Sequence, residues 1–257
     1  GKTSSCFHLA GALAKDRYRV LLIDNDPQAS LTQGFFGPDA TRAIAPGSSV
    51  AALYDPGYDP PPELLIVPSG CDGISLVPGS IALTRFNKLP DEVWPDSEQG
   101  IRSFVEAVEG EFDLILIDCP PNLHLCSWAS LVTSDWIVVP LQAEDFGSQG
   151  LAPVQASIRD VQSGPNPALG LAGYLLTMFD RRLAVHQTYD GLLREMYGGA
   201  VFANPFPLAK DFKEAVMGRK PIEHYKPKSV AAKAVATVAA ELLERVGLVI
   251  PVERGAA

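Results

Sequence analysis

Two short apolar segments that each end in an aspartate constrain the fold most strongly. Residues 19–24 read RVLLID and residues 112–118 read FDLILID. Both are too short for a typical helix and are apolar at successive positions, as expected for parallel strands buried on both faces. Residues 136–141 (WIVVPL) have the same character, and residues 170–177 (GLAGYLLT) have it more weakly. These segments predict the interior of a parallel sheet.

The stretches between these segments are helical in pattern. Strands separated by helices imply right-handed crossovers, so we predict an α/β fold with a mainly parallel sheet and helices on both faces. No linker divides the 257 residues, of which 47% are hydrophobic, so one domain is expected over 1–257. The predicted helices cover 3–15, 98–109, 123–133, 146–162, 184–197 and 229–247.

Residues 34–97 are less regular because they are rich in proline and glycine. We predict loops, one or two short helices, and a strand pair at 64–67 and 73–77. The composition also allows disorder around 54–62.

Composition excludes several classes of protein. No apolar run reaches the roughly 18–20 residues that span a bilayer. The four cysteines lack C-x-x-C spacing, which argues against structural zinc and favours reduced thiols in a cytosol. A formal charge of −9 excludes a globally basic surface, so any contact with nucleic acid must come from a local patch.

The first residues, Gly1, Lys2, Thr3 and Ser4, lead directly into a predicted helix. A phosphate-binding loop ends in this way, with a lysine for the β- and γ-phosphates and a hydroxyl for Mg²⁺. The tetrapeptide alone is weak evidence, and an ordinary helix start is the favoured explanation when these four residues are taken alone.

Three aspartates follow predicted strands. Asp24 and Asp26 lie at the carboxyl end of the first strand and Asp118 at the end of the second. Ligands of open α/β sheets bind at this edge, where carboxylates can reach a metal shell or an attacking water. Each aspartate alone fits an ordinary turn. Together with Lys2 and Thr3, they match the needs of a Mg-nucleotide site.

Five segments together resemble the ParA/Soj partition ATPases, which are relatives of MinD and have the P-loop NTPase fold. The segments are GKTS, VLLIDNDPQASLT, LILIDCPPNLHL, IVVPLQAEDFGSQGL and MGRKPIEHYKPKSVAAKA. The similarity covers nearly the whole chain, and its D-x-D-P-Q and I-D-C-P-P elements are fairly specific.

The resemblance implies roles for individual residues. Residues 1–4 would bind ATP, with Lys2 on the β- and γ-phosphates and Thr3 on Mg²⁺. Asp26 would position the hydrolytic water, while Asp24 and Asp118 would support the metal shell. Residues 119–127 would form a switch that senses the γ-phosphate. The family also implies an ATP-dependent homodimer, nonspecific DNA binding and stimulation by a ParB-like partner, in the cytoplasm on the nucleoid.

The sequence departs from the family pattern in two places. The family's loop reads K-G-G-x-G-K-[ST], whereas the sequence given begins at its last glycine. We therefore expect the sequence to be truncated, without the first strand, most of the phosphate loop and the signature lysine, and with open sheet edges on both sides of the gap. The second departure comprises Asn25, Ala29 and Ser30, and we expect its effect to be mild.

A locally basic segment covers residues 205–233. It carries seven basic and three acidic side chains, a net +4, whereas the rest of the chain is −13. This asymmetry suits phosphate binding without base-specific contacts, although a solvated helical face is the simpler alternative. The candidate DNA-binding residues are Arg181, Lys210, Lys213, Arg219, Lys220, Lys226 and Lys228.

Several functions remain open at this stage. A partition ATPase is favoured. A related ATPase that positions a protein cargo, a nucleotide-binding module without hydrolysis, and an iron–sulfur relative are the alternatives. A membrane-bound MinD-like role is not favoured, because residues 242–257 contain Gly247 and Pro251 and lack a basic amphipathic pattern.

Overall fold

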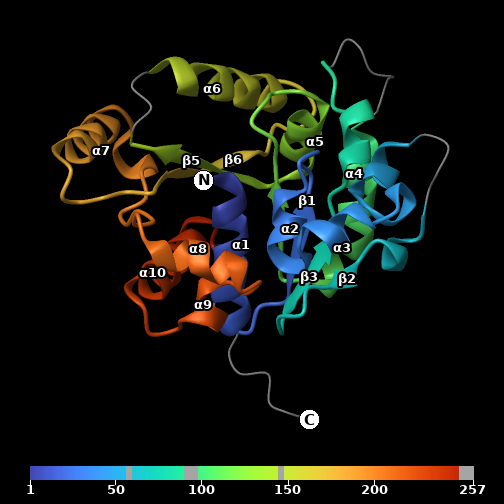
Figure 1. Cartoon of the computed structure of the whole chain (residues 1–257). Helices are drawn as coiled ribbons and strands as arrows, with labels where there is room; N and C mark the ends of the chain where they lie inside the picture. The colour runs from blue at the N-terminus through green and yellow to red at the C-terminus, as the bar shows by residue number, and fades with distance from the viewer. Residues whose placement is uncertain (56–59, 90–97, 144–147, 249–257) are drawn as a thin grey trace.

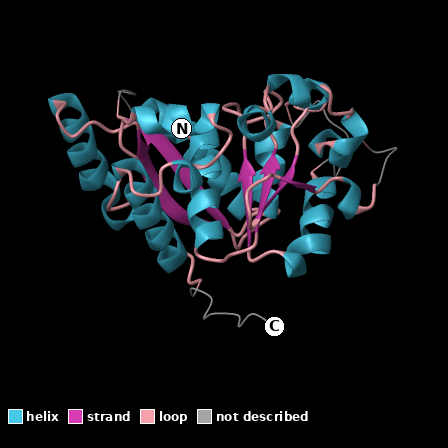
Figure 2. Cartoon of the chain, turned by 60° about the horizontal axis from the view of Figure 1, so that its bottom comes forward, coloured by secondary structure: helices cyan, strands magenta, loops and turns pink. Residues whose placement is uncertain are grey.

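The strands form two sheets in a computed structural model that describes residues 1–55, 60–89, 98–143 and 148–248. The first sheet has the order β2-β3-β1-β4 and the second pairs β5 with β6. Figure 2 shows the two sheets side by side with helices around them. The strands are β1 (Val20–Asp24), β2 (Val67–Pro68), β3 (Ile74–Val77), β4 (Leu114–Asp118), β5 (Trp136–Gln142) and β6 (Gly170–Thr177).

All pairings except that of β2 with β3 are parallel. The register of β1 and β4 places Asp24 opposite Asp118 at the carboxyl edge of the first sheet. The predicted convergence of these two aspartates is therefore confirmed.

The helices match the predicted stretches closely. Each predicted helix is present, with ends that differ by two residues or fewer. The helices are α1 (Lys2–Lys15), α2 (Ser30–Phe36), α3 (Pro38–Arg42), α4 (Gln99–Val108), α5 (Leu125–Thr133), α6 (Ser148–Gln162), α7 (Ala184–Tyr197), α8 (Lys210–Met217), α9 (Ile222–Tyr225) and α10 (Val230–Arg245).

Alternate residues of β1 pack into two separate cores. Val20 and Leu22 contact the core formed with α1 and α10, whereas Leu21 and Ile23 contact the core formed with α4 and α5. Figure 1 shows α1 and α10 on one side of the sheet and α4 on the other. Helices therefore cover both faces of the sheet, as predicted. Because β1 is buried on both faces, apolar and polar residues do not alternate along it.

The irregular region was predicted only in part. A strand over 64–67 was wrong, because Pro62–Leu64 form a 3₁₀ turn and the strand is limited to Val67–Pro68. Proline at the start of that segment fixes φ and lacks the N–H that a ladder needs. Two further 3₁₀ turns, η2 (Val50–Tyr54) and η4 (Ile81–Arg85), pack beside the first sheet. Part of the segment expected to allow disorder, 56–59, lies outside the described residues.

The two sheets are not joined by strand pairing within the described ranges. There β4 pairs only with β1 and β5 only with β6, so each of these two strands has one edge without a strand partner. In the described part of the chain, no helix combines the length and apolar character needed to cross a bilayer.

Candidate active site

The N-terminus of α1 lies between the carboxyl ends of the two sheets. A Cβ atom on Gly1 would lie 2.5 Å from Oγ1 of Thr177, the last residue of β6. On the other side, Lys2 and Thr3 both act on the carboxyl group of Asp118. A side chain at the first position would therefore collide with the Thr177 side chain unless that side chain moved. Figure 1 shows the chain start above α1 and beside β5.

The first turn of α1 carries no compensating negative charge. Gly1 has no side chain that could cap the helix, and no acidic residue lies in the first turn. The free N–H groups and the helix dipole therefore favour an anion at this end of the 14-residue helix.

Asp118 is a buried carboxyl group whose two oxygens accept no hydrogen bond of normal geometry, although the Thr3 hydroxyl lies near enough to lower its pKa. Its side chain is fully buried, and neither carboxyl oxygen has a hydrogen-bond partner. The pKa of Asp118 is raised to about 7, mainly by burial and also by the charge of Asp24, against the lowering effects of the Thr3 hydroxyl and the charge of Lys2. A buried carboxylate without donors is costly unless a cation or its bound water supplies the missing interactions.

Asp24 is also buried, but one of its oxygens is occupied. Oδ2 accepts hydrogen bonds from the backbone N–H of Thr32 at 2.7 Å and from its hydroxyl at 2.6 Å. Burial raises the pKa of Asp24 to about 6, against the lowering effect of the Thr32 bonds. Oδ1 is buried without a partner. Asp24 thus holds the first turn of α2 against β1 through Oδ2, while Oδ1 can still accept a hydrogen bond.

Asp26 lies two residues further on and is held by a tight turn. Its Oδ1 accepts the N–H of Gln28 at 2.9 Å, and its carbonyl accepts the N–H of Ala29 at 2.8 Å. Ala29 adopts a left-handed conformation with φ of 50°, which redirects the chain into α2. Asp26 is 8% exposed, whereas Asp24 and Asp118 are 0% exposed. It is thus the carboxylate of the three that water reaches.

Two residues of the site were missed by sequence analysis. The backbone N–H of Gly79 donates to Oγ1 of Thr32 at 2.8 Å, and a Cβ atom there would lie 2.7 Å from the carboxyl carbon of Asp24. Asn25, treated as a mild departure, is fully buried and forms several side-chain hydrogen bonds. The mild effect stays an untested prediction, but the location is central.

The basic segment is less uniform than its sequence suggests. Lys226 is held by Asp211 at 2.9 Å and by Glu214, and Lys210 lies 3.6 Å from Glu214. The Arg219 guanidinium donates to the carbonyl of Gln33 at 2.7 Å. Among the described residues, no ion pair is found for the exposed side chains of Arg181, Lys213, Lys220 and Lys228.

The segment with Arg181 lies beside the segment that leads to Lys210. The backbone N–H of Leu208 donates to the carbonyl of Phe179 at 2.9 Å, and Phe179 and Pro207 form a parallel bridge. The fold therefore brings two of the candidate DNA-binding residues into one region, although 29 positions of sequence separate them.

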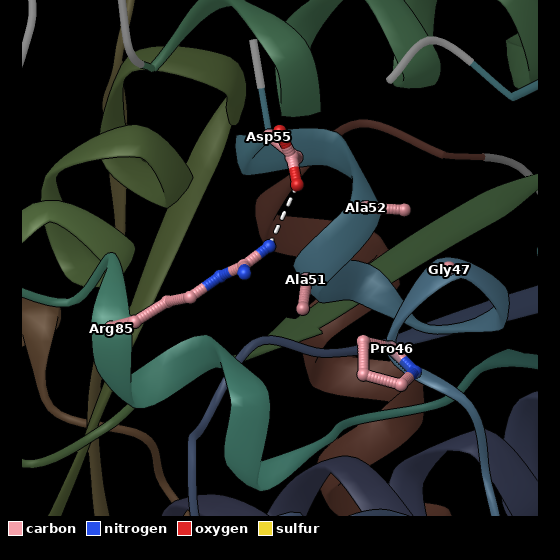
Figure 3. A pocket seen from close by; sticks show the side chains of 6 residues that line it. All are labelled: Pro46, Gly47, Ala51, Ala52, Asp55 and Arg85. Atoms are coloured by element: carbon pink, nitrogen blue, oxygen red, sulfur yellow. Dashed lines mark hydrogen bonds and ion pairs between the residues drawn. The ribbon is translucent and has the colours of Figure 1, made fainter. Parts of the chain in front are cut away.

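Two hollows of the described surface lie away from the three aspartates. One of about 220 Å³ is bordered by η2 and η4, with an ion pair of 2.7 Å between Asp55 and Arg85 on its rim (Figure 3). Another of about 340 Å³ lies between α2 and α8. Neither is lined by the three aspartates. In the described ranges, no three His, Cys, Asp or Glu side chains form a metal cluster. Mg²⁺ needs no such cluster, because it binds through one or two carboxylates plus phosphates and water.

Comparison with known proteins agrees with this geometry. A family model described as an AAA domain matches residues 1–171. The chromosome-partitioning ATPase Soj of Thermus thermophilus is 34% identical over 96% of this chain and 92% of that protein. The chain belongs to the ParA/Soj-like family of P-loop ATPases.

Solved structures support the same assignment of fold. Cobyrinic acid a,c-diamide synthase from Mycobacterium smegmatis with bound ADP and magnesium is 27% identical, with a TM-score of 0.77 over 96% of this chain and 90% of that one. The cell division ATPase MinD from Pyrococcus furiosus has a TM-score of 0.73 at 18% identity over 95% and 93%. The predicted α/β P-loop fold, ATPase activity, and use of ATP and Mg²⁺ are thereby confirmed for this ParA/Soj-like chain.

Proposed function

We propose that this ParA/Soj-like ATPase is a partition switch. It binds Mg-ATP at the α1 N-terminus, dimerises, binds DNA nonspecifically, and hydrolyses ATP faster in the presence of a ParB-like partner. The observation that carries this proposal is the buried carboxyl of Asp118 beside Lys2 and Thr3, with neither oxygen hydrogen-bonded.

The residues around Asp118 suit a magnesium ion and a triphosphate. Thr3 would ligate Mg²⁺, while Asp118 and the free Oδ1 of Asp24 would accept hydrogen bonds from its water shell. Lys2 and the free N–H groups of the first turn of α1 would bind the phosphates together with Gly1 and Ser4. Bound Mg²⁺ would neutralise charge on the phosphates.

Asp26 is suited to the hydrolytic step. It is partly accessible to water, and its turn holds the carboxylate next to the carboxyl end of β1. We assign it the orientation of the attacking water, and we assign Asp24 the joint task of fastening α2 and supporting the metal shell.

The nucleotide part of the proposal is tested by ATP turnover and binding. Lys2→Ala is expected to reduce turnover at least about 100-fold, because charge on the transferred phosphoryl group loses a stabilising partner. Lys15→Ala is the matched control, since Lys15 lies at the other end of α1 and pairs with Glu223 at 2.8 Å. Omitting Mg²⁺ is expected to abolish turnover. Equal turnover by wild type and Lys2→Ala would contradict this assignment.

The DNA part is tested by comparing two sets of cations. Lys220→Ala with Lys228→Ala is expected to weaken ATP-dependent DNA binding about tenfold and to lower its salt dependence, since each contact releases a counterion. Lys226→Ala is expected to change affinity less than about twofold, because its ammonium is already paired with two carboxylates. Equal losses in both sets would contradict a specific patch, and ATP turnover without DNA binding would favour a protein cargo instead.

The switch itself is tested by size and stimulation. We expect the ATP-bound form of an Asp26→Ala variant to elute as a dimer and the ADP-bound form as a monomer in size-exclusion chromatography. A ParB-like protein encoded beside the gene is expected to raise turnover in the presence of DNA. A monomer under both conditions would contradict the proposed dimerisation.

A further inference from the structure

Asn25 contacts both ends of one loop. Its backbone N–H donates to the carbonyl of Asp118 at 2.9 Å, and its side-chain amide donates to the carbonyl of Cys126 at 2.8 Å. The residues between these two carbonyls form the segment after β4 and the beginning of α5, which starts at Leu125. One residue thus fixes the distance between the beginning and the end of residues 119–125.

The Asn25 side chain belongs to a closed buried network. Tyr54 donates its hydroxyl hydrogen to Oδ1 at 3.0 Å, Nδ2 also donates to Oγ of Ser130 at 2.9 Å, and that hydroxyl donates to the carbonyl of Cys126 at 2.8 Å. Asn25, Tyr54 and Ser130 are 0%, 2% and 3% exposed. A fully satisfied polar network in a dry interior is rigid and specifies one arrangement.

The peptide groups of Cys126 are held from both sides. Its N–H donates to Oδ1 of Asn87 at 3.2 Å, while its carbonyl accepts from Asn25. Asn87 follows η4, and its own carbonyl contacts Nδ1 of His124 at 3.2 Å. The start of α5 is therefore fastened both to the strand that carries the aspartates and to the region around η4.

Asn25 also lies between the two aspartates of the site. Asp24 precedes it and Asp26 follows it, so the backbone that presents these carboxylates is the backbone that holds the loop. A displacement of residues 119–125 that separates Cys126 from Asn25 breaks the network. Conversely, an intact network keeps the loop in register with Asp24, Asp26 and Asp118.

We propose that Asn25 is a positioning residue that clamps residues 119–125 against the nucleotide site and thereby sets the rate of ATP hydrolysis. This inference rests on the proposed function, because it assigns regulation of that site to the buried amide. Asn25 is fully buried and is assigned no contact with nucleotide or metal. Its loss lowers kcat, and the affinity for ATP changes little because the α1 N-terminus and Asp118 keep their places.

The test separates positioning from stability with a paired substitution. Asn25→Leu alone leaves the Tyr54 hydroxyl buried without its partner, so it is expected to lower Tm. Asn25→Leu with Tyr54→Phe replaces both partners by apolar groups, so most of the lost stability returns while the clamp stays absent. Tyr174→Phe is the matched control, because Tyr174 is also 2% exposed and loses one hydrogen bond, from Gln155 at 2.8 Å, in the other sheet.

Two measurements are made on these variants. Steady-state hydrolysis of Mg-ATP gives kcat and KM, and hydrogen exchange without nucleotide gives the protection of residues 119–126. For Asn25→Leu/Tyr54→Phe we expect kcat to fall about tenfold, with KM within about twofold, since small displacements of a catalytic array are costly. We expect faster exchange in residues 119–126 only. Tyr174→Phe is expected to match wild type in both.

A wild-type kcat in the restored double variant would overturn the inference, even if exchange is faster, because the network would then be structural only. If Asn25→Leu variants do not fold, Ser130→Ala/Tyr54→Phe removes both side-chain partners but keeps Asn25. We expect about a threefold lower kcat there, and an unchanged kcat would overturn the inference equally. If wild type itself hydrolyses no ATP, the proposed function fails separately. The clamp is then decided by exchange alone, where unchanged protection overturns it.

Discussion

The carboxyl ends of β1 and β4 carry the same sequence pattern but different surroundings. Both strands are apolar runs that end in aspartate, and Asp24 and Asp118 lie opposite one another in register. Every residue of β1 is buried, whereas the residues of β4 before Asp118 are only partly buried. Asp24 receives two hydrogen bonds from Thr32, and Asp118 receives none.

The difference arises from the segment that comes after each strand. After β1 a tight turn leads into α2, whose first turn folds back onto Asp24. After β4 two prolines impose an extended exit, and α5 begins only at Leu125. The first turn of α2 therefore donates hydrogen bonds to Asp24, whereas the extended segment after β4 donates none to Asp118. Asp24 thus mainly holds α2 against β1, whereas the oxygens of Asp118 are suited to interact with a cation.

The largest expected effect is on kcat and concerns Asp26, the carboxylate that lies beyond the end of β1. Asp26→Asn keeps the turn, because an amide oxygen can also accept the N–H of Gln28. We expect kcat to fall by about 100-fold or more, as for loss of a group that orients or accepts a proton. Thermal unfolding should be unchanged. A large drop in stability with a normal kcat would instead assign Asp26 a structural role like that of Asp24.

Asp118→Asn should act oppositely on stability and on binding. Removing the buried charge is expected to raise the free energy of unfolding of the nucleotide-free protein by about 1–3 kcal/mol, the cost of an unsatisfied buried group. Mg²⁺-dependent nucleotide binding should weaken at the same time. Denaturant unfolding and calorimetric titration with Mg-ATP measure the two effects. A destabilised variant would mean that Asp118 is satisfied in the free protein.

Thr32→Val tests the other strand end. It removes the hydroxyl that donates to Asp24 and accepts from Gly79, so we expect a loss of about 1–2 kcal/mol in the free energy of unfolding. Thr32→Ser keeps the hydroxyl and is the matched control. If Thr32→Val leaves the free energy of unfolding unchanged, the hydrogen bonds to Asp24 do not stabilise the protein, which would contradict the proposed difference between the two strand ends.

The pH dependence of that contrast provides a further test. In the nucleotide-free protein the pKa of Asp118 is raised to about 7, above the usual value near 4. Between these values the folded state holds a proton that the unfolded state has lost, so stability falls as pH rises from about 4 to 7. The stabilisation by Asp118→Asn should therefore be complete above pH 7 and absent at pH 4. Unfolding titrations in EDTA at both pH values measure it, and a gain at pH 4 equal to that at pH 7 would contradict it.

Sequence patterns predicted most of the regular elements because each element has a characteristic spacing of apolar residues within its own segment. The run LILID and the helical stretch at 184–197 carry their own periodicity, and both were predicted within a residue or two. The prediction of a strand at 64–67 failed because Pro62 governs the local backbone. Helices α8 and α9 were not foreseen, since eight and four residues are too few for a clear period.

The candidate site shows the same division. Lys2, Thr3, Asp24, Asp26 and Asp118 could be named because their types and order match a nucleotide site, although their roles remain proposals. Asn25 and Gly79 could not be ranked, since an asparagine or glycine after a strand has many ordinary uses. The pairing of Lys226 with Asp211 and Glu214 was equally hidden, because only folding brings these charges together.

By itself, the sequence determined the strand–helix alternation, the aspartates at the ends of β1 and β4, and the charge imbalance of residues 205–233. These features depend on side-chain type and spacing along the chain. Only the tertiary structure decided that Asp24 is hydrogen-bonded while Asp118 is not, and that Asn25 holds both ends of residues 119–125. Hydrogen-bond donors and low-dielectric surroundings come from segments distant in sequence, so only packing can assign them.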